Sequence, residues 1–125
     1  MNPTNSIFFL IIEARPTAGA ASAQDLDGAN VNVWVMEGNT LDAMTAACSH
    51  ILEYAWVARR VRFIGEVTSD LMDAIDEVET HSYEEALRQG ISATFYGWTT
   101  ELRSPEFFEY RPLKPNPHAR GKLAH

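Results

Sequence analysis

Residues 7–15 read Ile-Phe-Phe-Leu-Ile-Ile-Glu-Ala-Arg and give the strongest strand signal in the chain. Such a β-branched and aromatic run, ending at Pro16, is typical of a central strand buried on both faces. From Val31 to Met36, valines alternate with other side chains, and this period of two predicts a second strand that ends at Gly38. We expect the two strands to pair antiparallel, joined by a long loop.

Two helices and two further strands follow. Asn39 offers a capping side chain to a helix. Its apolar stripe is Leu41, Met44, Cys48, Ile51, Leu52 and Ala55. Alternation of apolar and polar residues predicts strands over residues 56–67 and 91–100. Between them, the helical spacing of apolar residues over residues 70–78 suits a short helical turn. The capping box that begins at Ser82, together with Gly90 as a left-handed cap, predicts the start and end of the second helix.

The sequence therefore predicts a single α+β domain over residues 1–102. It comprises a four-stranded antiparallel sheet in the chain order β-β-α-β-α-β with the helices on one face, ferredoxin-like in character. Residues 103–125 hold four of the six prolines and five basic residues, which predicts an extended proline-rich basic C-terminal arm. Its aromatic residues are expected to dock on the domain or on a second subunit. These dimer-arm candidates are Phe107, Phe108 and Tyr110.

Size, charge and cysteine usage exclude several classes of protein. A chain of 125 residues that is 46% hydrophobic can bury a core without metals or crosslinks. Cys48 is the only cysteine, which excludes an intramolecular disulfide and fits a reducing compartment. The net charge of -7 argues against nucleic acid as a partner. Because no apolar stretch is long enough to span a bilayer, we expect a cytoplasmic protein with no membrane contact.

Three segments together resemble a group of short bacterial proteins of unassigned function. They are Gly28-Ala-Asn-Val-Asn-Val-Trp34, Glu53-Tyr-Ala-Trp56 and Tyr83-Glu-Glu-Ala-Leu-Arg-Gln-Gly90. The resemblance covers the middle of the chain and implies a bacterial source, but no activity. The chain departs from the group in its proline-rich basic tail, and in Ala55, where a glycine before the tryptophan is common.

No standard catalytic motif occurs in the sequence, so we expect no catalytic residue, cofactor or metal site. His50, with Glu53 three residues on, has the spacing of an imidazole oriented by a carboxylate, but a boundary histidine is the simpler interpretation. Cys48 lies on the apolar helix stripe and is expected to be a buried small hydrophobe rather than a nucleophile.

The densest acidic region covers residues 70–85 and also contains His81. Its oxygen ligands suit a hard divalent cation, but their spacing matches no known loop, and a solvated face is the simpler interpretation. The more informative hypothesis is an acidic docking face that steers a basic protein partner. The docking candidates are Asp73, Asp76, Glu77 and Glu84.

A second set of candidates lies on the predicted strands. Arginines on one face of the third strand could clamp a phosphate or carboxylate, although cross-strand pairing with Glu13 or Glu37 is the simpler expectation. Aromatic residues opposite the valines could line a ligand pocket, or belong to the core. The ligand-binding candidates are Asn32, Trp34, Tyr96, Trp98, Arg60 and Arg62.

The leading functional prediction is a non-catalytic binding or regulatory module that acts through protein–protein contacts, for example an immunity-type inhibitor that masks a basic toxin surface. We also expect a homodimer, which would cover the edge strands and the open sheet face. The alternatives are a small-molecule-binding protein that uses the aromatic sheet face, and an uncommon enzyme that relies on His50 or His81.

Overall fold

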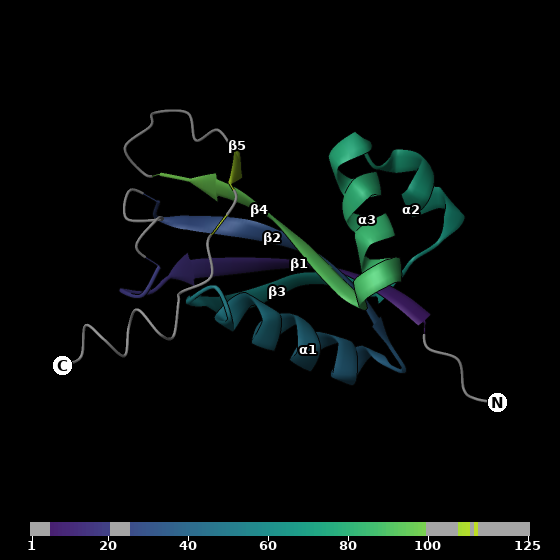
Figure 1. Ribbon diagram of the computed structural model, residues 1–125, viewed down its shortest axis with the longest axis horizontal. Coiled ribbons are helices and arrows are strands. Elements are labelled where there is room, and N and C mark those ends of the chain that lie inside the picture. Colours follow the sequence, from purple (N-terminus) through teal and green to yellow (C-terminus); the bar gives the residue numbers. More distant parts are fainter. Residues whose placement is uncertain (1–5, 21–25, 100–107, 111, 113–125) are drawn as a thin grey trace.

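The computed structural model describes residues 6–20, 26–99, 108–110 and 112, the last strand by its backbone alone (Figure 1). Its elements are β1 (Ser6–Pro16), β2 (Gly28–Glu37), α1 (Thr40–Leu52), β3 (Trp56–Glu66), α2 (Ser69–Ala74), α3 (Glu77–Gln89), β4 (Ile91–Trp98) and β5 (Phe108–Tyr110). No helix in these ranges combines the length and apolar character needed to cross a membrane.

The strands form one antiparallel sheet in the order β3-β1-β2-β4-β5, which confirms the α+β class and the four long antiparallel strands. The ferredoxin-like character is not confirmed. A ferredoxin-like chain runs β-α-β-β-α-β, whereas here the β1–β2 hairpin comes first and forms the centre of the sheet. The added strand β5 was not predicted.

One face of the sheet carries the larger apolar core. Alternate residues of β1, including Leu10 and Ile12, lie there with Val31, Val33 and Val35 of β2. Helix α1 covers this face. Its contact stripe is Ala43, Ala47 and Ile51. The predicted stripe was wrong at its two largest outer members, since Leu41 is 65% exposed and Leu52 61% exposed. Alanines bring the helix axis close to the valine-rich strand, where longer side chains would hold it away.

Helices α2 and α3 cover the opposite face, so the prediction that the helices share one face was wrong (Figure 1). The reason lies in β1, where Phe9, Ile7 and Ile11 alternate with the residues that meet α1. A central strand that is apolar on both sides needs a cover on both sides.

Helix α3 begins six residues earlier than predicted. Asp76 is its N-cap and accepts a hydrogen bond from the backbone N–H of Glu79 at 2.9 Å. The capping box at Ser82 was therefore wrong as a helix start. Ser82 lies inside α3, buried, and its carbonyl accepts a hydrogen bond from the Ser92 hydroxyl at 2.7 Å. The C-terminal cap at Gly90 is confirmed, with φ of 94°.

The two outer strands differ in how they resist pairing with another chain. In the β1–β3 ladder the register shifts twice, and at the shifts Arg59 and Arg62 lie opposite no residue of β1 in the backbone register. Bulges and charged side chains are common devices that protect a sheet edge. At the other edge, β5 pairs with residues 95–97 of β4. The four preceding residues of β4, Ile91 to Thr94, are uncharged and follow no bulge.

Candidate functional site

A buried carboxylate links α3 to the middle of the sheet. Glu79 is 5% exposed, and each of its two oxygens accepts a hydrogen bond. The Trp34 indole N–H donates to Oε1 at 2.8 Å, and the Tyr96 hydroxyl donates to Oε2 at 2.5 Å. Buried carboxylates are rare unless they are partnered in this way. Glu79 therefore ties a core tryptophan to a half-buried tyrosine at the sheet surface.

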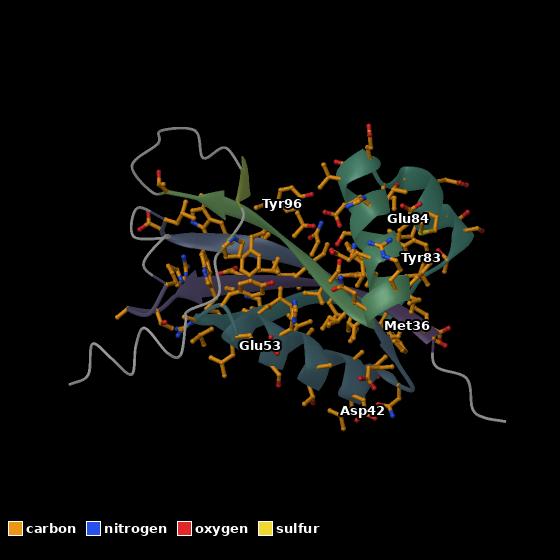
Figure 2. The ribbon with its side chains drawn as sticks, in the orientation of Figure 1. Met36, Asp42, Glu53, Tyr83, Glu84 and Tyr96 are labelled. Carbon is orange, nitrogen blue, oxygen red and sulfur yellow. The ribbon has the colours of Figure 1, made fainter. Side chains whose placement is uncertain are left out.

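Trp34 is held in place by aromatic contacts as well as by Glu79. Its ring centroid lies 4.5 Å from that of Phe9 and 5.5 Å from that of Tyr83, with a T-shaped contact to the tyrosine. Its relative exposure is 0%. Trp34 thus belongs to the core and fixes Glu79, whereas Tyr96 of β4, labelled in Figure 2, reaches the carboxylate from a partly open position.

A groove of about 440 Å³, the Glu79 groove, opens beside this carboxylate, between the sheet and the corner where α2 meets α3. Its lining residues are Phe9, Ile11, Asn30, Asn32, Leu71, Ala74, Ile75, Asp76, Glu79 and Tyr96. Apolar walls with a few converging polar groups are typical of small-molecule sites. Asn30 and Asn32 make no side-chain hydrogen bond to any other described residue.

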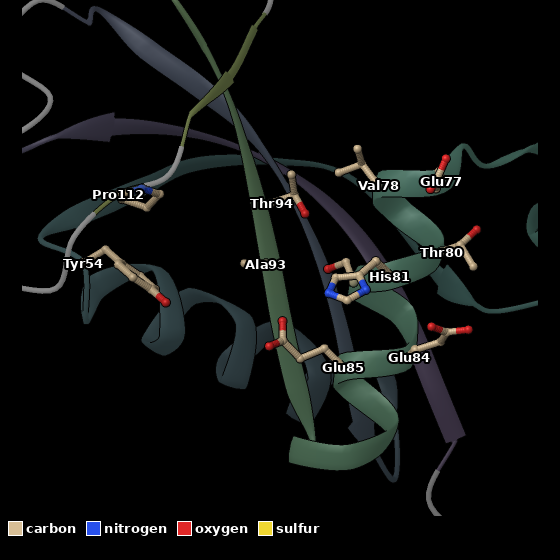
Figure 3. Close-up of a pocket in the computed structure, with 11 residues that line it drawn as sticks. Tyr54, Glu77, Val78, Thr80, His81, Glu84, Glu85, Ala93, Thr94 and Pro112 are labelled. Atoms are coloured by element: carbon tan, nitrogen blue, oxygen red, sulfur yellow. The ribbon is translucent and has the colours of Figure 1, made fainter.

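A second groove of about 680 Å³, the α3–β4 groove, runs between α3 and the uncharged part of β4. Figure 3 shows Glu77, His81, Glu84 and Glu85 on the α3 side, and Tyr54 and Pro112 across β4. Among the described lining residues, three side chains are carboxylates and none is lysine or arginine. Within the described part of the chain, the two grooves share no lining residue.

The floor of the α3–β4 groove is a sheet edge with backbone groups directed outward. Met36 N–H donates to the Gly90 carbonyl at 2.9 Å, so that carbonyl points toward β2. In a trans peptide the N–H of the next residue points the opposite way, which turns the Ile91 N–H to the outer edge. Alternation along an antiparallel strand turns the Ala93 N–H outward as well. Among the described strands, none pairs with β4 at these positions.

The structure separates the predicted ligand-binding candidates. Asn32 and Tyr96 both line the Glu79 groove, as their shared sheet face predicted. Trp98 lies farther along β4, where the Arg15 guanidinium sits 5.2 Å from its ring centroid. Arg62 donates to Glu13 at 3.0 Å, which confirms the simpler expectation of cross-strand pairing. Arg60 lies opposite Glu13 in the ladder, on the same distant strand.

The docking candidates are likewise divided. Glu77 and Glu84 line the α3–β4 groove, whereas Asp76 lines the Glu79 groove and caps α3. Asp73 is exposed on α2 and lines neither groove. Of the dimer-arm candidates, Phe107 lies outside the described residues, and Phe108 and Tyr110 are described as the backbone of β5.

The candidates for unusual chemistry find ordinary surroundings. The His50 ring packs edge-on against Tyr54, with centroids 5.5 Å apart. Cys48 is partly buried against the α1 core, and this burial raises the pKa of its thiol, the opposite of what a nucleophile needs. Across the described residues, no three His, Cys, Asp or Glu side chains are grouped closely enough to hold a metal ion.

Sequence reasoning missed Glu79 and Asn30. Glu79 was counted in an acidic surface region, and its real position follows only when α3 begins at residue 77. Glu79, Ser82 and Ala86 then form a single buried stripe. The alternation of β2 could have predicted that Asn30 lines the groove, because Asn30 lies on the same sheet face as Asn32.

Comparison with known proteins gives no match at the level of protein-family models, of curated proteins or of solved structures. The resemblance to short bacterial proteins therefore stays a prediction, and functional conclusions rest on the geometry of the two grooves.

Proposed function

We propose that this protein is a non-catalytic binding module that takes a basic, extended segment of a partner protein into the α3–β4 groove. The observation that carries the proposal is the combination of an uncharged, outward-facing strand edge with a carboxylate-lined wall along its length. An immunity-type inhibitor of a basic toxin is one protein of this kind.

The strand edge supplies the backbone part of the recognition. An extended segment placed beside Ile91 to Thr94 would continue the sheet past the position where β5 ends. Addition of a strand to a sheet edge draws its affinity from main-chain hydrogen bonds, and its selectivity from side-chain pockets on the two sides. Because bulges and arginines occupy the β3 edge, β4 is the edge suited to this role.

The wall of the groove supplies the charge selectivity. Glu85 points toward β4 from the α3 side, and Glu77 and Glu84 lie on the outer side of the same helix, at the rim of the groove (Figure 3). Alternate side chains of an added strand point to the same side, so lysines or arginines at every second position would meet these carboxylates. The net charge of -7 also speeds the approach of a basic partner and repels acidic ones.

Fluorescence anisotropy with a labelled peptide tests the proposal. An alternating Lys-Val octapeptide is expected to bind, with affinity that falls as salt is added, while the alternating Glu-Val octapeptide does not bind. A Lys-Val peptide N-methylated at alternate residues keeps the charge and loses the main-chain donors, so it is expected to bind far more weakly. Equal binding of the methylated peptide would show attraction without strand addition and overturn the proposal.

Charge-neutral variants locate the binding surface. The triple change Glu77→Gln, Glu84→Gln and Glu85→Gln removes three surface charges, of which that of Glu85 is half-buried. The expected loss is about tenfold in affinity, because surface ion pairs contribute about 0.2–1 kcal/mol each. The matched control also removes three charges, by Asp42→Asn and Glu53→Gln at the two ends of α1 (Figure 2) and Glu66→Gln at the end of β3. An equal loss in the control variant would mean that net charge alone attracts the peptide.

The predicted homodimer is a rival occupant of the same edge. Sedimentation of the free protein over a range of concentrations, with and without the Lys-Val peptide, distinguishes the two. A dimer that the peptide dissociates is consistent with the proposed edge, since both ligands then use it. A dimer that blocks peptide binding at every concentration would assign the β4 edge to a second copy, against the proposal.

A further inference from the structure

Two side-chain amides in the Glu79 groove are open to a ligand. Asn30 and Asn32 are half-buried residues two apart on β2, so their side chains lie on the same sheet face. Each amide offers two N–H donors and one carbonyl acceptor. Neither amide has a hydrogen-bond partner elsewhere in the described ranges. Both amides are partly exposed, so a ligand that displaces water from them can use their donors and acceptors.

The charge of the groove selects among ligands. Glu79 and Asp76 contribute carboxylates, and the described residues that line the groove include no lysine, arginine or histidine. Each Glu79 oxygen accepts one hydrogen bond, from Trp34 or from Tyr96, and retains a second acceptor site. A ligand that donates hydrogen bonds and carries a positive charge meets this arrangement, whereas an anionic ligand is repelled by it.

The walls of the groove indicate the size and the apolar character of the ligand body. Phe9 and Ile11 of β1 form one apolar side of the groove, and Leu71 and Ile75 of the α2–α3 corner form the other. The volume of about 440 Å³ accommodates a ligand with one ring or a short chain. Helix α2 contributes no fully buried residue, so its wall is the less firmly held of the two.

We propose that the Glu79 groove binds a small organic amine, with its ammonium near Glu79 and Asp76 and its apolar body between Ile11 and Ile75. A hydrogen-bonding group on the body of the amine meets Asn30 and Asn32. This site is separate from the α3–β4 groove, with which it shares no residue. Its failure would therefore leave the proposed peptide-binding function standing, and the reverse also holds.

Titration of the full chain with tyramine, followed by proton–nitrogen correlation NMR, tests the proposal. The signals to follow are the Trp34 indole N–H and the side-chain amides of Asn30 and Asn32. Tyramine is expected to shift all three saturably. The matched probe 3-(4-hydroxyphenyl)propionate has the same ring and a carboxylate in place of the amine, and is expected to leave them unchanged. Equal shifts with both probes, or no saturable shift with tyramine, would overturn the proposal.

Two substitutions separate charge from folding. Asp76→Asn keeps an N-cap for α3, because asparagine caps as well as aspartate, and removes one negative charge. It is expected to weaken tyramine binding about threefold, while Asn32→Val is expected to weaken it about tenfold, the value of one hydrogen bond to a charged or polar ligand group. Glu84→Gln in the other groove is the control. A loss with Glu84→Gln equal to that with Asp76→Asn would show nonspecific attraction to an acidic protein, and contradict the assignment.

Discussion

Replacing Glu79 with alanine tests the central contact of the α3 side. The change removes the acceptor of the Trp34 indole N–H, a group on a side chain with 0% exposure. A buried donor left without a partner costs about 1–3 kcal/mol. The Tyr96 hydroxyl is half-buried and can be hydrated, so the loss of its hydrogen bond costs about 0.5–1.5 kcal/mol. The higher helix propensity of alanine stabilises α3 by less than about 0.5 kcal/mol and offsets little of this loss.

The expected decrease in the free energy of unfolding is therefore about 1–4 kcal/mol. Urea unfolding followed by far-UV circular dichroism measures it without relying on Trp34, whose fluorescence the change alters directly. Glu79→Gln keeps one acceptor oxygen and is expected to lose about half as much. Glu84→Ala changes an exposed glutamate on the same helix and is expected to stay within about 0.5 kcal/mol. A Glu79→Ala protein as stable as Glu84→Ala would refute the role given to this carboxylate.

Three further changes probe other parts of the fold. Gly90→Ala places a side chain at φ 94° and is expected to cost about 1 kcal/mol, measured as a lower Tm with unchanged far-UV circular dichroism. Gly28→Ala puts a methyl group against Trp98 and 2.7 Å from Arg15 Nη1, so the ring-current shifts of Arg15 in NMR are expected to disappear. Burial raises the pKa of the Cys48 thiol, so its contribution to stability is complete below the ordinary thiol pKa and is lost as the pH rises through the folded pKa. Urea unfolding at stepped alkaline pH is expected to show this loss, and Cys48→Ala to abolish it.

The strands could be predicted because their signals are local. β1 is apolar on both faces and is indeed the central strand next to β2, with Phe9 and Leu10 buried on opposite faces. The alternation of β2 and β4 also assigned the correct face to Asn32 and Tyr96. Period-two patterns report which face a residue occupies, and they do so without knowledge of the partner strand.

The helix faces could not be predicted with the same success. On α1, the large residues Leu41 and Leu52 were expected to pack, whereas the packed residues are Ala43 and Ala47. Alanine occurs on both buried and exposed helix faces, so the sequence pattern does not show which face of α1 packs. The alanine face packs because it lets the helix approach the valine-rich strand closely. Placing both helices on one face had a similar cause, because nothing local says which side of a sheet a crossover takes.

The start of α3 shows two local signals in competition. Both Asp76 and Ser82 are good N-cap residues, and Ser82 also has the glutamate of a capping box three residues later. The earlier cap wins because it adds a turn and a half of helix that buries Glu79 against Trp34, and because Ser82 finds a partner in Ser92 on β4. The candidate site depends on this choice, since Glu79 reaches the sheet only as part of α3.

The two faces of the sheet divide stability from binding. On the α1 face the side chains of β2 are Ala29, Val31, Val33 and Val35, all buried, so this face supplies a continuous apolar core. On the α3 face, β2 presents Asn30 and Asn32, and β4 presents Ser92 and Thr94. A second apolar layer would stabilise the fold more than these polar groups do. Their placement between a buried carboxylate and an open strand edge is instead what recognition of a polar, cationic ligand requires. Substitutions of the β2 valines should therefore change stability, whereas substitutions of Asn30 and Asn32 should change binding more than stability.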